Sequence, residues 1–445
     1  MNIRKLLLYY RNTAEVAPTF TGATFSLQNT TVTNDLAADG YSWSQAHPIV
    51  FDNNGNLITL AQRRNGGNTV HCFTWKNVGD SWQDANFTEG FLARGSITLD
   101  ATNNVIHVLW NAIDAADGII YRRYTITYSG SDITAITKDT NVNLQLDLQS
   151  TGSMQYEHPI MTFLSDTAYG TYGAILATWS ARNAGTGNQI RSSLCVLDAT
   201  ADSGKTAGNW QAVTTASASH LGNQPAVTYS VLADNTNTAV MYQSIGRSSD
   251  KDLMLFYFDG GNVRKLFYRR AIWNAANNDW RDGLTTAQEI SNVVRTGTDG
   301  GYNLKDQLGT KVVEDSNNNI WFGFANWKNN TDGDTISLIS VKNDVLSSLI
   351  DVYSVGAAHS YAPCVDIDTY GKYLIVAYIN TTDQDIYLAA YKNTTQSTAP
   401  TSIYTTRPVD IPLIKIRGNK AYFVFRDTIN TPTPPYTGIY GEVTI

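Results

Sequence analysis

The same pattern of apolar and polar positions returns seven times along the chain: a short apolar strand, a tight polar turn and a second apolar strand. In the first copy, HPIVF and NLITLAQ flank the turn DNNG. Five copies carry proline at the same place, which suits the first residue of a strand because no ladder hydrogen bond needs its missing N–H. The copies begin at His47, Gly95, His158, Gln224, Thr310, Ala362 and Ile411. A unit that recurs every 45–85 residues or so predicts stacked or radially arranged β-sheets.

The last copy contains only three strands before the chain stops at Ile445: VDIPLIKIR, KAYFVFRD and GIYGEVTI. The alternating segment 22–34 could supply the fourth, and pairing the two ends would remove exposed sheet edges. We therefore predict an all-β, seven-bladed β-propeller of four-stranded blades, closed by the N-terminal strand. Two regions are expected, an N-terminal arm over 1–20 and one propeller domain over 21–445. The blades should start near residues 46, 94, 157, 223, 309, 361 and 410.

Two further phrases recur in the outer strands. IIYRRYTI (119–126) and KLFYRRAIW (265–273) are expected to be third strands of the second and fourth blades. A tryptophan follows a polar turn at Trp82, Trp210 and Trp280, and each should pack between neighbouring blades.

Composition narrows the function classes. The chain of 445 residues has a net charge of −7, whereas a nucleic-acid-binding protein would show a basic stripe, so no nucleic-acid partner is predicted. The N-terminal run LLLYY is too short for a signal peptide. No apolar run approaches the roughly 18 residues of a membrane span, so no membrane insertion is predicted.

No cofactor and no metal site is predicted. The three cysteines, Cys72, Cys195 and Cys364, lack metal-type spacing and are expected to be small buried apolar residues. The segments DNNGN (52–56) and DSNNN (315–319) look superficially like calcium loops, but they lack the remaining ligands and are expected to be β-turns.

The segment NVGDSW (77–82) matches the Asp-box turn, with Asn77 in place of the aspartate. With the two YRR strands and the turn from Asp52 to Gly55, it gives the chain a resemblance to BNR-repeat propellers, which occur in sialidases and several polysaccharide lyases. The resemblance implies a propeller fold and chemistry on carbohydrates.

In a propeller, the residues before each innermost strand and the loops after each second strand meet on one face, where ligands commonly bind. Aromatic rings there could stack on sugars, and arginines could bind carboxylates in bidentate fashion. Candidate catalytic residues are His47, His158 and Tyr156. Candidate ligand-binding residues are Trp43, Arg63, Arg94, Trp110, Arg182, Gln224, Trp327, His359, Tyr361 and Arg426.

Three functions remain open. The first is a surface-exposed propeller that recognises a glycan or polysaccharide without catalysis. The second is a lyase acting on uronate polysaccharides, with His47 or His158 as base, Tyr156 or Tyr361 as acid and Arg63 or Arg182 facing the carboxylate. The third is a non-catalytic scaffold.

Sialidase chemistry is a weaker enzymatic alternative. Arg63, Arg182, Arg247 and Arg426 could supply its arginines, and Tyr156 beside Glu157 its nucleophile. Adjacent residues of a strand point to opposite faces, however, which favours the lyase over the sialidase.

The chain lacks a classical export signal, yet its charge-poor, Asn- and Thr-rich composition is typical of proteins that work outside cells. Both features suit a virion component, such as a phage tail or capsid-associated protein. We therefore expect it outside the cell or on a virion surface, with residues 1–20 docking to an assembly partner.

Overall fold

The chain is described by a computed structural model. It covers residues 16–28, 36–41, 49–65, 68–85, 89–90, 92–112, 118–148, 154–165, 169, 172–183, 187–197, 210–213, 217–219, 228–235, 242–259, 263–276, 280, 283–296, 310–327, 334–354, 365–380, 382–405, 412–427 and 437–445.

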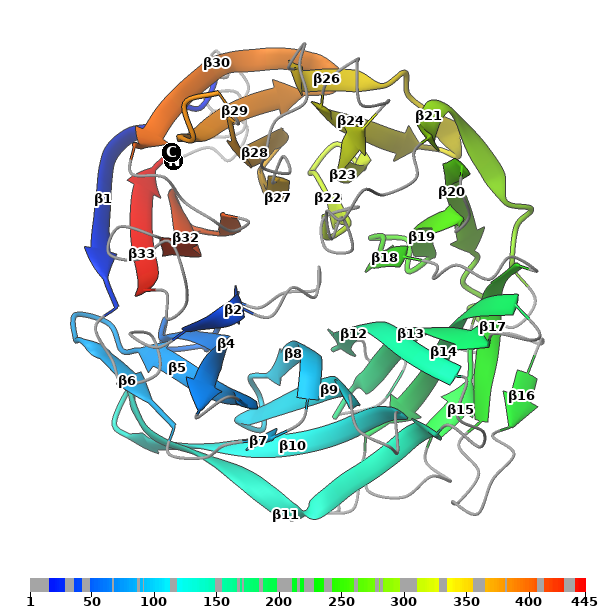
Figure 1. Cartoon of the computed structure of the whole chain (residues 1–445), viewed down its shortest axis with the longest axis horizontal. Coiled ribbons are helices and arrows are strands. Elements are labelled where there is room, and N and C mark those ends of the chain that lie inside the picture. Colours follow the sequence, from blue (N-terminus) through cyan, green and yellow to red (C-terminus); the bar gives the residue numbers. More distant parts are fainter. Residues whose placement is uncertain are drawn as a thin grey trace, which may run out of the picture.

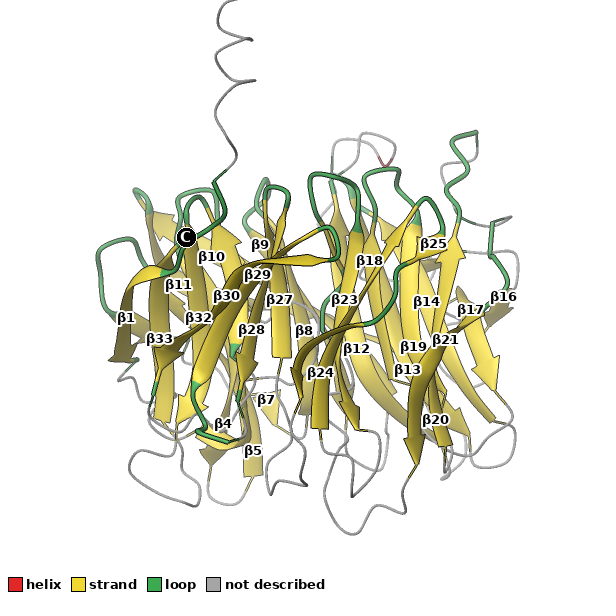
Figure 2. Cartoon of the chain, turned by 90° about the horizontal axis from the view of Figure 1, so that it is seen from above, coloured by secondary structure: helices red, strands yellow, loops and turns green. Residues whose placement is uncertain are grey.

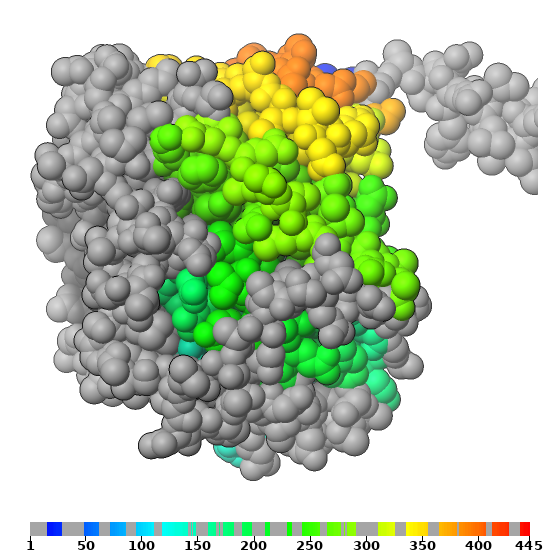
Figure 3. Space-filling model, turned by 90° about the vertical axis from the view of Figure 1, so that its right-hand side faces the viewer, coloured from blue at the N-terminus to red at the C-terminus, as the bar shows by residue number. Residues whose placement is uncertain are grey.

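Seven antiparallel sheets surround a central axis, and the chain visits them in order around the ring (Figure 1). The described residues contain no α-helix, and none of them forms a helix long and apolar enough to cross a membrane. The all-β, seven-bladed β-propeller expected from the repeats is therefore confirmed. Figure 3 looks at the outer wall, where the described surface passes from green through yellow to orange in chain order.

Blades 1 and 2 follow the N-terminal strand. Blade 1 contains β2 (Leu36–Tyr41), β3 (Ile49–Phe51), β4 (Leu57–Asn65), β5 (Asn68–Lys76), β6 (Trp82–Asp84) and β7 (Glu89–Gly90), with β2 and β3 both pairing β4 on the inner side. Blade 2 contains β8 (Leu92–Asp100), β9 (Val105–Ala112), β10 (Gly118–Ser129) and β11 (Asp132–Leu148).

Blades 3 and 4 differ in their outer strands. Blade 3 contains β12 (Met154–Leu164), β13 (Ala174–Asn183), β14 (Gly187–Val196), β15 (Trp210–Ala212), β16 (Ser217–Ser219) and β17 (Thr228–Asn235). Blade 4 contains β18 (Tyr242–Arg247), β19 (Leu253–Asp259), β20 (Val263–Ala271) and β21 (Gln288–Thr296). The two YRR phrases lie in β10 and β20, the third strands of blades 2 and 4, as predicted.

Blades 5 to 7 complete the ring. Blade 5 contains β22 (Val313–Glu314), β23 (Ile320–Trp327), β24 (Asp334–Lys342), β25 (Val345–Leu346) and β26 (Ile350–Ser354). Blade 6 contains β27 (Val365–Tyr370), β28 (Tyr373–Ile379), β29 (Ile386–Lys392) and β30 (Thr395–Tyr404). Blade 7 contains β31 (Leu413–Arg417), β32 (Lys420–Asp427), β33 (Thr437–Thr444) and β1 (Thr21–Leu27).

The prediction for blade 4 was wrong in one respect. The segment from Gln224 was expected to open this blade, but the described strand that follows it, β17, pairs with β14 in the outer part of blade 3. The innermost strand of blade 4 is β18, which begins at Tyr242. The proline and the alternating pattern indicate a strand correctly, but they do not specify which strand pairs with it.

The ring closes within blade 7. β1 lies antiparallel to β33 and is the outermost strand of blade 7, which confirms the predicted closure (Figure 1). Phe25 stands opposite Gly441, where any side chain would overlap the Phe25 ring. The same ring contacts Tyr404 of blade 6 at a centroid distance of 4.8 Å, so the closing strand also joins blade 7 to blade 6.

Strands with an unbroken run of apolar residues are buried on both faces of their sheet. All seven residues of β28 (YLIVAYI) are buried. Leu374 and Val376 pack in a hydrophobic core shared with blade 5, whereas Ile375 and Ala377 pack in a second hydrophobic core shared with blade 7. Because alternate side chains of a strand point to opposite faces, a middle strand of a propeller serves two cores at once.

The three predicted tryptophans pack between blades. Trp82 of blade 1 meets Tyr440 of blade 7 at a centroid distance of 5.5 Å, and Trp210 of blade 3 meets Tyr121 of blade 2 at 5.2 Å. Trp280 is fully buried in the core shared by blades 3 and 4.

In two of the polar turns expected from the sequence, residues of the turn donate hydrogen bonds to the aspartate of the same turn. Asp52 accepts hydrogen bonds from the backbone and side chain of Asn56 at 2.8 and 2.7 Å. Asp315 accepts from Asn319 in the same way, and also from the indole N–H of Trp321 at 2.9 Å. Both segments are turns, as predicted, and their carboxylates bind the chain itself.

The propeller has two faces, shown edge-on in Figure 2. We call the face where the innermost strands begin the strand-start face, and the face with the hairpin turns between innermost and second strands the turn face. Residues 16–20 dock near the turn face: the Tyr373 hydroxyl donates to the Val16 carbonyl at 3.5 Å, and Ala17 and Phe20 pack on the core between blades 6 and 7. Ile445 donates its N–H to the carbonyl of Asn419 in the β31–β32 turn at 2.8 Å, on the same face.

Candidate functional site

Neighbouring innermost strands run side by side around the axis and are joined by side chains. Ser96 and Thr98 of β8 accept hydrogen bonds from the backbone N–H groups of Met161 and Phe163 in β12, at 2.9 and 3.0 Å. Each innermost strand has one edge without a strand partner in its own blade, and an unpaired backbone donor there would be costly once buried. The hydroxyl groups of one blade therefore satisfy the open edge of the next.

Blades 6 and 7 use the same arrangement with carboxylates. Asp366 of β27 accepts from the N–H of Ile414 at 2.9 Å, and Asp368 accepts from the N–H of Ile416 at 2.7 Å. The spacing of two residues on both strands matches the pair in blades 2 and 3. It shows that β27 and β31 run in the same direction, so both begin on the strand-start face.

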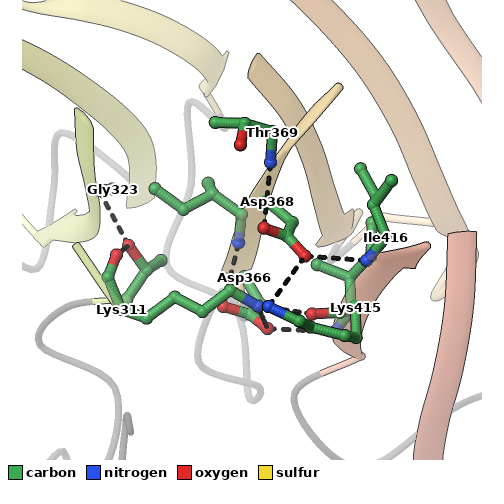
Figure 4. Close-up of polar contacts among 10 residues, drawn as sticks. Lys311, Gly323, Asp366, Asp368, Thr369, Lys415 and Ile416 are labelled. Atoms are coloured by element: carbon green, nitrogen blue, oxygen red, sulfur yellow. Dashed lines mark hydrogen bonds and ion pairs between the residues drawn. The ribbon is translucent and has the colours of Figure 1, made fainter. Parts of the chain in front are cut away.

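Lys311, at the entry to blade 5, extends this contact across three blades (Figure 4). Its Nζ lies 3.1 Å from Asp366 Oδ2 and also donates to the Ile414 carbonyl. Lys311 is 6% exposed and Asp366 is 6% exposed, so the ion pair is shielded from water. Lys415 adds a second cation, 3.7 Å from Asp368 Oδ2.

The two carboxylates respond differently to this environment. Burial raises the pKa of Asp366 above its usual value, even with Lys311 beside it. Burial would also raise the pKa of Asp368, but the charges of Lys311 and Lys415, with the N–H groups of Ile416 and Thr369, outweigh it and hold that pKa below its usual value. Neighbouring carboxylates with opposite shifts are a feature of many functional sites, but here both also bind backbone N–H groups between blades.

Several candidate residues have a described backbone position on or near the strand-start face. Tyr156 and His158 lie in β12, the innermost strand of blade 3, and Arg94 lies in β8 of blade 2. Arg182 lies in β13 directly opposite Gln155 of β12.

The remaining candidates with described backbones come from second strands of other blades. Arg63 lies in β4, Trp327 is the last residue of β23, and Arg426 is near the end of β32. The Arg426 side chain is buried, 5% exposed.

Trp110 does not lie where the sequence suggested. It stands opposite Gly95 in the β8–β9 pair, and a Cβ at Gly95 would overlap its indole ring. The indole has no exposed surface and belongs to the core between blades 1 and 2. Trp110 thus fills the space that the glycine leaves, and it is not available to a ligand in this structure.

Arg247 also differs from expectation. It is the last residue of β18, the innermost strand of blade 4, so it lies at the turn face rather than at the strand-start face. Its guanidinium is 5.8 Å from the centre of the Trp273 ring.

Five candidates fall outside the described residues: Trp43, His47, Gln224, His359 and Tyr361. The side chains of Arg63, Arg94, Tyr156, His158, Arg182 and Trp327 are likewise not described. Their proposed roles remain predictions.

Sequence reasoning missed the group formed by Lys311, Asp366, Asp368 and Lys415. A signal existed, because Lys311 stands in the repeat position that proline occupies in five copies. The alternation VDID in β27 also places two carboxylates on one face of an otherwise apolar strand.

A metal site is not apparent within the described ranges: no group of three or more His, Cys, Asp or Glu side chains there is arranged to hold an ion. Cys72 and Cys195 are buried, as expected, and neither forms a disulfide, and Cys364 lies outside the described residues.

No protein-family model matches the chain, and no curated protein matches it by sequence. Among solved structures, it is similar to the polysaccharide lyase Uly1, with 11% identity, a TM-score of 0.52, and coverage of 90% of this chain and 89% of the lyase. An α-L-arabinanase from Penicillium chrysogenum gives 12% identity and a TM-score of 0.47, covering 84% of this chain and 99% of that one. The endosialidase of phage phi92 gives 9% identity and a TM-score of 0.42, covering 95% and 69%. At such identities the likeness to the lyase concerns the fold.

Proposed function

We propose that the chain recognises a glycan or polysaccharide on its strand-start face. The observation that supports this most is the position of Arg94, Tyr156 and His158 on innermost strands, with Arg182 opposite β12. Arginine, tyrosine and histidine at these backbone positions suit a ligand rich in hydroxyl and carboxylate groups. The fold shared with a polysaccharide lyase agrees with this choice of ligand.

A second candidate function is lyase activity on a uronate-containing polysaccharide. His158, or His47, would remove the proton from the carbon beside the carboxylate, and that electron pair would form a carbon–carbon double bond. The bond from carbon to the leaving sugar oxygen would break, and Tyr156, or Tyr361, would give that oxygen its proton. Arg182 or Arg63 would neutralise the carboxylate and so stabilise the charge that develops on it.

A glycan array and an ultraviolet assay test both candidates. Binding to one class of glycan supports recognition, and rising absorbance from an unsaturated product supports the lyase. If the lyase operates, His158→Ala should lower turnover by about 10²-fold or more without changing the melting temperature. A blank array together with no absorbance change would overturn both and leave the scaffold function.

The proposal includes a virion role, with the chain as a phage tail or capsid-associated component that binds an assembly partner through residues 1–20. Its support is the Asn- and Thr-rich, charge-poor composition. Immunogold labelling of purified particles tests it. If particles purified from cells that produce the chain carry no label, the virion role is contradicted.

A further inference from the structure

Three tyrosine rings form a stack at the seam between blades 5 and 6. Tyr378 of β28 and Tyr387 of β29 face each other across the two strands, with ring centroids 5.7 Å apart and an interplanar angle of 21°. Tyr353 of β26 continues the stack from blade 5, 5.7 Å from Tyr378 at 33°. The middle ring, Tyr378, is buried, while the two outer rings are partly exposed.

Polar groups hold the outer rings in place. The Tyr387 hydroxyl donates to Asp383 Oδ2 at 2.8 Å, and the Tyr353 hydroxyl donates to Asn380 Oδ1 at 2.5 Å. The hydrogen bond to Asp383 is the main cause that raises the pKa of Tyr387 to about 12, so its phenol stays neutral at any physiological pH. Asp383 is exposed, and Asp385 lies two residues further along the same loop.

The loop that carries these carboxylates is fixed by its own backbone. The N–H of Asn380 donates to the Asp385 carbonyl at 3.0 Å, and the N–H of Gln384 donates to the Asn380 carbonyl at 2.8 Å. Asp385 Oδ2 also accepts from Ser402 of β30 at 2.9 Å. A pre-organised loop loses little conformational freedom when a ligand binds.

The stack lies on the strand-start face but away from the axis. The loop joins the second and third strands of blade 6, so it opens on the face where β27 begins. Tyr353 is next to the end of the outer strand β26, which places the stack outward from the innermost strands. One extended chain could therefore contact both the residues near the axis and this seam.

We propose that the stack of Tyr353, Tyr378 and Tyr387, with Asp383 and Asp385, is a second subsite that binds a neutral sugar unit of the polysaccharide. This inference rests on the proposed function. Exposed aromatic surface suits the apolar C–H faces of a sugar ring, and carboxylate oxygens accept hydrogen bonds from its hydroxyl groups. Two aspartates would repel a uronate, so the unit bound here should be uncharged, in contrast to the unit proposed to bind beside Arg94 and Arg182.

Titration calorimetry with a panel of neutral hexasaccharides (cello-, manno-, arabino- and galacto-) and a uronate hexasaccharide tests this subsite. Tyr387→Ala should weaken binding of the neutral sugar by about tenfold, whereas Tyr387→Phe, which keeps the ring, should stay within about twofold. Asp383→Ala, at an exposed position that need not disturb folding, should also weaken neutral-sugar binding. The uronate hexasaccharide should bind these variants as it binds the wild type.

Tyr422→Ala is the matched control. Tyr422 is a partly exposed tyrosine in another aromatic pair, with Phe51 at 4.9 Å, but it lies at the start of β32 near the turn face. It should leave all sugar affinities unchanged. If the wild type binds glycans and both Tyr387→Ala and Asp383→Ala bind the neutral panel equally well, the subsite is wrong and the proposed function stands. If the wild type binds no glycan, the proposed function fails as well.

Discussion

Lys311 of blade 5 and Asp366 of blade 6 form a buried ion pair, with 3.1 Å between Nζ and Oδ2. The same ammonium group also donates a hydrogen bond to the Ile414 carbonyl of blade 7, so the Lys311 side chain joins blade 5 to blades 6 and 7. In five other repeats this position is a proline, which restricts the backbone locally. Lys311 instead forms a contact between blades.

Lys311→Met should destabilise the propeller by about 3 kcal/mol, because the variant leaves Asp366 buried without its cation. Adding Asp366→Asn should recover much of this loss, since the amide is neutral and its oxygen can still accept from the Ile414 N–H. Unfolding in urea of the wild type, both single variants and the double variant measures the coupling. Additive losses would show that the two side chains do not interact.

Asp368 gives a pH dependence with a defined sign. Its pKa is lower in the folded chain than the ordinary value of 3.8, so the unfolded chain binds the proton more readily. The stability that Asp368 contributes is therefore present above that ordinary value and is lost as the pH falls through the lower, folded pKa. Urea midpoints of the wild type and Asp368→Asn should differ at neutral pH and converge in acid. A constant difference would mean that the carboxylate charge is not involved.

Asn77 should not tolerate the aspartate that the Asp-box pattern has at this position. Its amide accepts from the Ile133 N–H at 2.9 Å and donates to the Ile133 carbonyl at 3.2 Å, which ties the blade 1 turn to β11 of blade 2. A carboxylate cannot donate, so Asn77→Asp leaves a buried carbonyl facing a negative charge. We expect a loss of about 1–3 kcal/mol, measured by chemical unfolding. Asp80→Asn, at an exposed position of the same turn, is the control and should change little.

The closing strand can be tested with two residues of β1. Phe25 packs against Phe425 at 6.0 Å as well as against Tyr404, and Phe25→Ala should cost about 2 kcal/mol because a partly buried ring is lost. Leu27 in the same strand is 50% exposed, so Leu27→Ala should stay within about 0.5 kcal/mol of the wild type. Equal effects of both substitutions on the unfolding midpoint would argue that β1 contributes no specific packing to the closure.

The fold could be predicted because the repeat and its missing strand are both visible in the sequence. Residues 22–34 alternate, the last copy is one strand short, and β1 (Thr21–Leu27) indeed completes that sheet. Pairing partners were harder to infer. The strand after Gln224 looks like the first strand of a blade, but its place beside β14 depends on contacts distant in sequence.

The contacts of the candidate site were harder to predict from the sequence than the fold was. Lys311 and Asp366 are 55 residues apart in the sequence, and only the ring brings them together. Trp110 looks like an aromatic platform, but the absent side chain at Gly95 draws its indole into the core. The tyrosine stack joins Tyr353 to Tyr387, and no local motif connects the two.

The position of the C-terminus has a practical consequence. Ile445 is anchored beside the β31–β32 hairpin of the turn face, and Figure 2 shows the C-terminus at the corresponding edge. A biotin or fluorophore attached at Ile445 would therefore lie on the turn face. Molecules captured through such a label on a sensor chip would all present the opposite side to the flowing solution, in a uniform orientation suited to measuring large, slowly diffusing polymers.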